Sequence, residues 1–328
     1  MRIFITGGAG YIGSHIVKEL LKEKYQIFIY DNLSQGHRQA VLGGFFIKGD
    51  LSDIIKLNNV FKKYRPQVVV HLAADSLIEE SMKKPEKYFE NNVLNGLNLL
   101  EAMVKNKIKY LIFSSSAAVY GQPKKMPIEE NTQLRPTNIY GQTKYIFEKL
   151  LEYFDKKYNL KYISLRYFNA AGADPSGEIG EDHRPETHLI PNILKVALGQ
   201  KRYLEIYGND YPTKDGTCIR DYIHVSDLAQ AHILALKFLV KNKKSKIYNL
   251  GSENGFSVKE VLEVARKVTG KKIPIKIKPR RIGDPSILIA SSAKIKKELG
   301  WQPKYSDLET IISTAWRFYQ KYPKGFRK

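Results

Sequence analysis

Residues 6–13 read Thr-Gly-Gly-Ala-Gly-Tyr-Ile-Gly and follow directly on the short apolar run Arg2–Thr6. A segment with helical patterning continues from them to about Glu23. Strand, glycine turn and helix in this order are typical of a dinucleotide site, because the backbone must approach the pyrophosphate closely and the helix N-terminus supplies N–H donors. The glycines predicted to contact the dinucleotide are Gly7, Gly10 and Gly13.

A second apolar run, Gln26–Tyr30, ends in Asp31. A carboxylate at this point can accept hydrogen bonds from the adenosine ribose hydroxyls. It also favours NAD over NADP, because the 2′-phosphate of NADP would meet a like charge. Asp50 follows the next predicted strand, and two interpretations of it stay open: a contact to the adenine, or the N-cap of the following helix.

Predicted strands and helices alternate through the first half of the chain. Apolar runs such as Val68–Val70 and Tyr110–Phe113 are what a sheet buried on both faces requires. We therefore predict an α/β fold with a Rossmann-type, doubly wound parallel sheet. The further predicted strands are Gly44–Lys48, Gln67–Ala73, Lys109–Ser115 and Lys161–Arg166, and the predicted helices are Asp53–Lys63, Pro85–Lys105 and Asn138–Lys157.

The regular alternation breaks after Asn169 into loops that contain glycine, proline and acidic residues. We predict an NAD-binding domain over residues 1–168 that returns at about 217–250, through a helix at Val225–Leu239 and a strand at Lys246–Leu250. A smaller, discontinuous α/β domain for the substrate is expected over residues 169–216 and 251–328. The substrate cleft should lie between these two lobes.

The segment Tyr140-Gly-Gln-Thr-Lys144 is predicted to open a helix about two dozen residues after the serine run Ser114–Ser116. Positions four apart lie on one face of a helix, so the tyrosine hydroxyl and the lysine ammonium can meet at one substrate atom. Lowering the tyrosine pKa from near 10 to about 7 needs roughly 4 kcal/mol of phenolate stabilisation. A lysine cation, a helix N-terminus and a cationic nicotinamide ring can supply it jointly, which makes Tyr140 a candidate acid and base.

The same spacing occurs elsewhere in the chain, which is rich in tyrosine and lysine. We interpret these other pairs as tyrosines at the edge of the core beside solvated lysines. They are Tyr120/Lys124, Tyr145/Lys149 and Tyr153/Lys157.

Composition is that of a globular protein with two lobes: 328 residues, 43% of them hydrophobic and 27% charged. The net charge of +21 is spread over many segments, so we expect no nucleic-acid surface. No membrane span or signal peptide is expected, which favours the cytoplasm. The single cysteine, Cys218, excludes an internal disulfide, and because we find no His/Asp/Glu group with ligand spacing, no metal site is predicted.

Seven motifs together resemble the UDP-glucose 4-epimerases of the extended short-chain dehydrogenase/reductase superfamily, from Met1 to about Trp301. The sugar-nucleotide 4,6-dehydratases of that superfamily carry an Asp-Glu pair just after the equivalent of Ser115, and this chain has Ala117-Ala118 in that neighbourhood, so the resemblance favours epimerisation over dehydration. The motifs are Thr6–Gly13, Ser114–Gly121, Tyr140–Lys144, Arg166–Asn169, Gly216–Val225, Tyr248–Gly251 and Arg280–Asp284.

The resemblance implies a mechanism. Tyr140, as phenolate, takes the proton of the sugar 4-hydroxyl, directly or through Ser116, while hydride leaves C4 for tightly held NAD. Lys144 bonds the nicotinamide ribose and lowers the pKa of Tyr140. The 4-keto sugar then turns while its UDP stays anchored, so that the hydride returns to the opposite face.

The resemblance also implies the remaining contacts. Arg220 and Arg281 form a diphosphate clamp, since guanidinium groups suit bidentate contact. Asn169, Leu189 and Tyr207 contact uridine and phosphate, and Asp284 accepts from the uridine ribose. The residues implied on the NAD side are Tyr11, Ile12, Asp31, Asn32, Ser34, Gly36, Asp50, Leu51, Leu72, Ala73, Ala74, Asn92, Ser114, Tyr140, Lys144 and Phe168.

Leu288 is implied to lie beside the sugar, where the family has a tyrosine in enzymes with a narrow pocket and a small residue in those that admit N-acetylated sugars. Ile287 or Ile289 takes this place if the match is displaced by one residue. The resemblance further implies a homodimer through helices Pro85–Lys105 and Asn138–Lys157. The alternatives are an epimerase of UDP-xylose/arabinose, UDP-glucuronate or N-acetylated sugars and, from another class, an NAD-bound scaffold or nucleic-acid binder.

Overall fold

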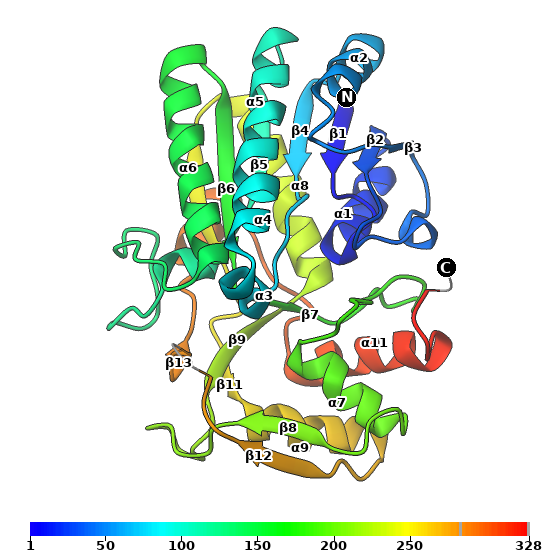
Figure 1. Cartoon of the computed structure of the whole chain (residues 1–328), viewed down its shortest axis with the longest axis vertical. Coiled ribbons are helices and arrows are strands. Elements are labelled where there is room, and N and C mark those ends of the chain that lie inside the picture. The colour runs from blue at the N-terminus through cyan, green and yellow to red at the C-terminus, as the bar shows by residue number, and fades with distance from the viewer. Residues whose placement is uncertain (282–283, 327–328) are drawn as a thin grey trace.

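A seven-stranded sheet forms the centre of the larger lobe of this computed structural model, which describes residues 1–281 and 284–326 (Figure 1). All its neighbouring strands run parallel, so the predicted doubly wound parallel sheet is confirmed. In spatial order the strands are β10 (Lys246–Leu250), β6 (Lys161–Tyr167), β5 (Tyr110–Ser116), β4 (Val68–His71), β1 (Arg2–Thr6), β2 (Gln26–Asp31) and β3 (Phe45–Lys48).

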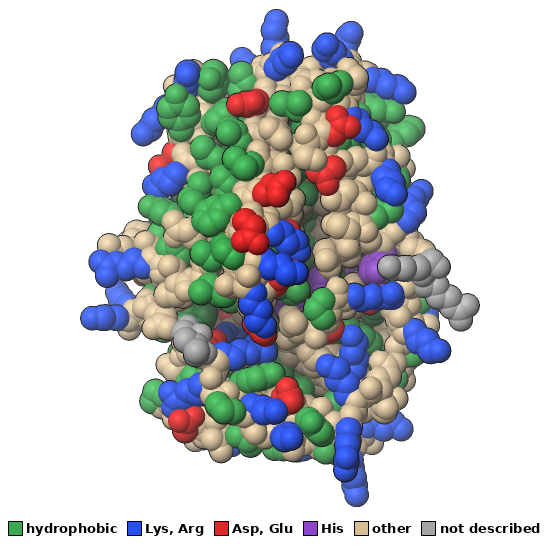
Figure 2. Space-filling model, viewed as in Figure 1, with side chains coloured by type: hydrophobic (Ala, Val, Ile, Leu, Met, Phe, Trp, Pro, Cys, Tyr) green, Lys and Arg blue, Asp and Glu red, His purple; other side chains and the backbone are tan. Residues whose placement is uncertain are grey.

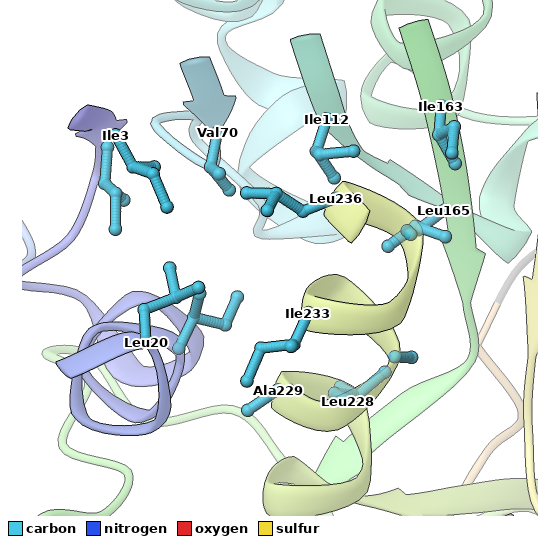
Figure 3. Packing of buried hydrophobic residues seen from close by; sticks show 14 of the residues in the cluster. Ile3, Leu20, Val70, Ile112, Ile163, Leu165, Leu228, Ala229, Ile233 and Leu236 are labelled. Carbon is cyan, nitrogen blue, oxygen red and sulfur yellow. The ribbon is translucent and has the colours of Figure 1, made fainter. Parts of the chain in front are cut away.

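Alternate residues of each strand enter different cores, because successive side chains point to opposite faces of a sheet. On β1, Ile3 and Ile5 join a cluster beneath α1 (Tyr11–Lys22) and α8 (Val225–Asn242), which Figure 3 shows from close by. Phe4, between them, packs into the cluster on the other face. Both faces of the sheet are therefore buried, as the continuous apolar runs require.

Helices cover the two faces in the order that right-handed crossovers produce. Helices α1 and α8 pack side by side on one face. On the opposite face, α5 contacts both α2 and α6. The helices of that face are α2 (Ile54–Tyr64), α5 (Asn95–Lys105) and α6 (Ile139–Tyr158).

The helix predicted over Pro85–Lys105 is interrupted in the structure. Helix α4 (Pro85–Phe89) passes into a π-helical turn over Glu90–Leu94 before α5 begins, and a short helix that was not predicted, α3 (Ile78–Lys83), precedes it. A π turn widens the backbone spiral locally and is frequent near functional sites. Here it carries Asn92, whose amide binds the backbone of Asp75.

The smaller lobe lies beyond the carboxyl ends of the parallel strands, toward which the arrows of β1 and β4 point in Figure 1. Its main sheet is built on β9 (Ile219–His224), which pairs with β7 (Asn169–Ala171), β11 (Gly255–Ser257) and β13 (Ile287–Leu288). Two further strands, β8 (Leu204–Tyr207) and β12 (Ile275–Lys278), pair with each other. The helices of this lobe are α7 (Leu189–Ala197), α9 (Val258–Thr269) and α11 (Leu308–Lys321).

The boundaries between the lobes differ in two places from those predicted. Strand β9, within the predicted return at about 217–250, pairs with strands of the smaller lobe. Helix α10 (Ala293–Leu299), within the predicted substrate segment 251–328, packs against β10 and α8, and Trp301 is buried in the core of the larger lobe. Among the described residues, no helix combines the length and apolar character that a bilayer crossing demands.

Candidate active site

The glycine-rich turn between β1 and α1 fits a bound pyrophosphate. Gly7 has φ +73°, and a Cβ atom on it would lie 2.6 Å from the backbone nitrogen of Ala73. A Cβ atom on Gly13 would lie 2.2 Å from the carbonyl oxygen of Gly7, so only glycine lets the helix start this close to the turn. Gly10 is the N-cap of α1 and makes no side-chain cap hydrogen bond, which leaves amide groups of the first turn for a ligand.

Asp31 lies at the end of β2, and its side chain is fixed by backbone donors. One carboxylate oxygen accepts from the N–H of Ala9 at 2.9 Å and the other from the N–H of Leu33 at 2.8 Å. Burial raises the pKa of Asp31, although these two N–H groups act in the opposite direction. Each oxygen retains a second lone pair, so the residue suits the ribose hydroxyls that the sequence assigns to it.

The structure decides between the two interpretations of Asp50, a contact to the adenine or the N-cap of the next helix. The N-cap of α2 is Asp53, whose side chain accepts from the N–H of Lys56 at 2.9 Å. Asp50 lies three residues earlier and accepts from the Asn32 side-chain amide at 2.6 Å and from Ser52. Asp50 is therefore not the N-cap of α2. It lines the same cavity as Asp31, as a contact to the adenine would require.

The candidate catalytic residues meet at the carboxyl end of β5. Ser116 is the last residue of that strand, and the Lys144 ammonium donates to the Ser114 carbonyl oxygen at 2.7 Å. Asn138 caps α6 through the N–H of Gly141, so Tyr140 lies in the first turn as predicted. A Cβ atom on Gly141 would lie 2.4 Å from the Ala118 carbonyl oxygen, so this glycine lets α6 approach the serine loop.

The electrostatics of this set differ from those expected. Burial raises the pKa of Tyr140, and only a hydrogen bond with Ser116 opposes the rise. Burial lowers the pKa of Lys144 to about 7, although the nearby Glu148 carboxylate raises it. The lysine nitrogen lies 5.8 Å from the centre of the Tyr140 ring. The expected lowering of the Tyr140 pKa by Lys144 is thus not produced by the protein groups alone.

The other tyrosine–lysine pairs lie apart from the cavity. Tyr120 is buried and donates to the Asn249 side chain at 2.7 Å, whereas Tyr153 is 54% exposed on α6. Tyr145 packs beside a small cluster that includes Val119. None of these three tyrosines lines the cavity that the described residues enclose, whereas Tyr140 does.

That cavity, of about 2050 Å³, runs between the two lobes. It is large enough for a dinucleotide and a sugar nucleotide together, since drug-sized ligands occupy roughly 300–1,000 Å³. Of the predicted site residues, Asn92 alone does not line it; its amide binds Thr143 at 3.1 Å and Asp75, and so ties the π turn to α6. The predicted substrate residues of the smaller lobe are all among its lining residues: Asn169, Leu189, Tyr207, Arg220, Arg281, Asp284 and Leu288.

The predicted diphosphate clamp is partly engaged within the protein. Arg220 forms an ion pair with Asp284 at 2.5 Å and donates to the Pro285 carbonyl oxygen at 2.7 Å. The Arg281 guanidinium lies 4.2 Å from the centre of the Tyr207 ring. Both guanidinium groups thus line the cavity, and these contacts fix the orientation of their planes. Residues 282–283 of the Arg280–Asp284 motif lie outside the described residues.

Two groups of interacting polar residues were missed in the sequence. Glu148, one turn beyond Lys144, forms an ion pair with Arg166 at 2.5 Å and accepts from Ser115 at 2.6 Å. The expectation that no group has metal-ligand spacing is wrong: ligand atoms from four residues lie within 4.8 Å of one another. The spacing Glu-x-His-x-x-Glu-x-His in the sequence could have indicated it; the residues are Glu181, His183, Glu186 and His188.

In the second group, the histidines and the glutamates shift one another's pKa values. Burial opposes protonation of His188, but the carboxylates of Glu181 and Glu186 raise its pKa well above the ordinary value. Although burial acts in the opposite direction, His188 and His183 lower the pKa of Glu181 to about 2. His188 also lines the cavity.

A glycine turn at a helix N-terminus, followed by a serine, tyrosine and lysine at the same sheet edge, defines a class: the dinucleotide-dependent oxidoreductases of the extended short-chain type. Comparison with known proteins narrows this class. The model of the NAD dependent epimerase/dehydratase family matches residues 3–251, and the chain belongs to that family.

Individual relatives agree with the family. A UDP-glucose 4-epimerase of Lacticaseibacillus casei is 53% identical over 99% of both chains. A crystal structure of a UDP-glucose 4-epimerase superposes with a TM-score of 0.98, at 52% identity and full coverage of both chains. The enzyme of Bifidobacterium longum, solved with NAD+ and UDP, superposes with a TM-score of 0.95, at 37% identity over 99% of this chain and 100% of that one. The resemblance stated from the motifs is confirmed.

Proposed function

We propose that this chain interconverts UDP-glucose and UDP-galactose, by oxidising and re-reducing C4 of the sugar with tightly bound NAD. The observation that carries the proposal is the convergence of Ser116, Tyr140 and Lys144 in a cavity that Arg220 and Arg281 also line. The geometry suits a sugar nucleotide that is held firmly by its diphosphate and loosely by its sugar. Loose holding is what a sugar that must turn within the site requires.

Tyr140 accepts the proton of the sugar 4-hydroxyl, and Ser116, with which it forms a hydrogen bond, can relay that proton. Bound NAD supplies the acceptor of the C4 hydride and then its donor, so no net redox change occurs. When the 4-keto sugar has turned, Tyr140 returns the proton to O4. Lys144, whose side-chain nitrogen is fixed by the Ser114 carbonyl oxygen, would hold the nicotinamide ribose of bound NAD.

Dehydration is disfavoured by the residues around the sugar. Ala117 and Ala118 line the cavity directly after Ser116, so this place lacks the acid and base that would expel water. What remains is redox chemistry at a single carbon. This observation also separates the chain from a binding scaffold, which would not need a serine, tyrosine and lysine at one point.

Turnover of UDP-galactose by the purified protein without added NAD tests the proposal. We expect UDP-glucose to accumulate until equilibrium, and NAD to be released when the protein is unfolded. A panel of UDP-xylose, UDP-glucuronate and UDP-N-acetylglucosamine discriminates the related epimerases. Absence of turnover by a protein that contains NAD would reject the proposal in favour of a scaffold.

Sugar selectivity is the finer part of the proposal, and it rests on Leu288. Of Ile287, Leu288 and Ile289, only Leu288 lines the cavity, and it lies opposite Arg220 in the pairing of β13 with β9. Leucine is smaller than tyrosine and offers no hydroxyl. We therefore expect UDP-N-acetylglucosamine to be turned over as well, though less efficiently than UDP-glucose.

Leu288→Tyr tests this selectivity. The added ring and hydroxyl should narrow the space for the N-acetyl group, so kcat/KM for UDP-N-acetylglucosamine should fall at least about tenfold relative to UDP-glucose, which is about 1.4 kcal/mol. Leu288→Met, which keeps nearly the same volume, is the matched control. An unchanged ratio in the tyrosine variant would remove Leu288 from sugar selection.

We also propose that two copies of the chain form a homodimer in the cytoplasm. Apolar side chains that are exposed on α3, the π turn and α6 support the dimer, since large exposed apolar patches mark interaction sites. The one free cysteine, Cys218, fits a reducing compartment.

A further inference from the structure

The loop between β7 and α7 brings two glutamates and two histidines together. Glu181, His183, Glu186 and His188 stand within eight residues, and one ligand atom from each lies within 4.8 Å of the others. All four line the wall of the cavity beside Leu189. None of them is among the residues assigned to proton transfer or to the diphosphate clamp, and the ring of Tyr11, from the glycine motif, lies 6.3 Å from that of His183.

Hydrogen bonds among the four side chains do not account for their arrangement. The Nδ1 atom of His188 lies 2.8 Å from an oxygen of Glu186 and 2.9 Å from an oxygen of Glu181. That same Glu181 oxygen lies 3.1 Å from Nδ1 of His183. A nitrogen atom of this type carries at most one proton, so it cannot donate well to two oxygens. The atoms converge on a common centre more than they pair.

A second observation concerns Glu186. Its side chain is only 1% exposed, yet its Oε2 atom has no hydrogen-bond partner, and Nδ1 of His183 lies 3.8 Å from it. A buried carboxylate oxygen without a partner is costly, by about 1–3 kcal/mol or more for a charged group. A cation at the centre would satisfy this oxygen and the converging atoms together.

We propose that these four residues form a closed binding site for one divalent transition-metal ion, with Zn²⁺ the ion favoured. Tetrahedral zinc with ligands at about 2.0–2.1 Å separates neighbouring ligand atoms by roughly 3.3 Å. The separations of 2.8, 2.9, 3.1 and 3.8 Å bracket this value, so adjustments of a few tenths of an ångström admit the ion. Two carboxylates also neutralise its charge.

Ligand chemistry and access agree with the assignment. Imidazole and carboxylate suit Zn²⁺, and four protein ligands leave no open position, which is typical of structural sites. The His188 side chain is 42% exposed toward the cavity, so an ion can enter. A metal here would hold the loop that leads into α7, because Leu189, the first residue of that helix, directly follows a ligand. The ion stabilises the cavity wall and takes no part in the redox step.

Metal content of the intact enzyme provides the direct test. Protein expressed without a histidine tag is treated with a chelator, dialysed against Zn²⁺ and analysed by mass spectrometry of the metal. We expect about one zinc per chain, an anomalous scattering peak between the four side chains in crystals, and the visible absorption of tetrahedral Co²⁺ when cobalt replaces zinc. Less than about a tenth of an equivalent of zinc in the folded wild-type enzyme would overturn the proposal.

Single substitutions then assign the ligands. His183→Gln and Glu186→Gln should weaken Zn²⁺ binding by more than the about 10- to 100-fold that loss of an outer-shell partner costs. His37→Gln is the matched control: its ring contacts the Asp182 backbone oxygen of the same loop at 2.9 Å, but it is not among the four ligands, so zinc binding should stay unchanged. Zinc binding by both ligand variants that equals wild type would also overturn the site. If a variant does not fold, the stoichiometry and scattering peak of the wild-type enzyme still decide.

Discussion

At the scale of single residues, the protein itself keeps Tyr140 protonated. Burial raises its pKa, and the Ser116 hydroxyl is the one neighbour that lowers it. A catalytic phenolate needs a further positive charge close to the ring, and the cationic nicotinamide of bound NAD provides one. In the proposed mechanism, Tyr140 would therefore become an active base only when the cofactor is bound.

Tyr140→Phe isolates this role, because it removes one oxygen atom and leaves the ring in place. We expect the variant to fold and retain NAD while turnover of UDP-galactose falls at least about a hundredfold, the scale of a lost general acid or base. Tyr145→Phe and Tyr153→Phe are matched controls on the same helix whose turnover should stay near that of wild type. Turnover near wild type in folded Tyr140→Phe would exclude the residue from the mechanism.

Lys144 gives a prediction about pH. Burial lowers its pKa from 10.5 to about 7, so the folded state favours the neutral amine. The stability linked to this group is therefore fully present above the unfolded pKa of 10.5, falls as the pH falls from there to about 7, and changes no further below that pH. Between pH 8 and pH 6 the wild type should lose about 1.4 kcal/mol relative to Lys144→Met, which has no charge to bury.

Thermal unfolding of the two proteins at several pH values measures this difference, with the NAD content of each sample determined. The melting temperature of Lys144→Met should rise relative to wild type as the pH falls. A difference that stays constant from pH 8 to pH 6 would show that the ammonium is charged throughout that range.

At the scale of secondary-structure elements, one buried ion pair joins the catalytic helix to the sheet. Glu148 on α6 and Arg166 on β6 are 2% and 3% exposed. Arg166 also donates to the Tyr120 hydroxyl, which in turn donates to Asn249 on β10. The network fixes the helix that carries Tyr140 and Lys144 relative to three other elements.

Arg166→Met should leave the Glu148 charge buried without its partner and lower stability by about 3–5 kcal/mol. The double variant Glu148→Leu/Arg166→Met should lose less, since neither charge remains. Lys267→Met, which breaks the exposed pair with Glu309, is the control and should cost about 1 kcal/mol or less. Denaturant unfolding followed by fluorescence measures these values. A double variant less stable than Arg166→Met would show that the pair itself stabilises the fold.

The same scale shows what the sequence could predict. The strands of the large sheet follow from local apolar runs, and the glycine turn and Tyr140–Lys144 from short motifs whose backbone demands are local. Strands β7, β11 and β13 are two or three residues long and pair with β9 from distant parts of the chain, so no local pattern indicates them. The Glu148–Arg166 pair and the convergence at Glu186 depend likewise on how the elements pack.

At the scale of the whole molecule, the charge of +21 does not gather at one place. On the face shown in Figure 2, lysine and arginine side chains are scattered around the edges of both lobes and near the middle of the face. Hydrophobic side chains instead gather on the same face over α5 and α6. The surface thus offers an apolar contact region more clearly than a basic groove for a nucleic acid.

That apolar region underlies the prediction of a homodimer. Of the large hydrophobic side chains that are strongly exposed, five lie on α3, the π turn or α6, and these elements adjoin one another through α4. A stable dimer buries about 1,200–2,000 Å² in total, which two such helix faces can supply. The five residues are Ile78, Met82, Leu94, Tyr153 and Tyr158.

Light scattering of the purified protein at micromolar concentration should therefore give twice the mass of the chain. Leu94→Asp and Tyr153→Asp introduce a charge into the proposed contact and should shift the equilibrium to monomer, because an unpaired charge buried between apolar faces is strongly disfavoured. Ile55→Asp is the matched control, since Ile55 is 74% exposed but lies on α2, away from that region. A stable monomer in the wild-type protein, or aspartate variants that remain dimeric, would mean that the chain does not pair through these helices.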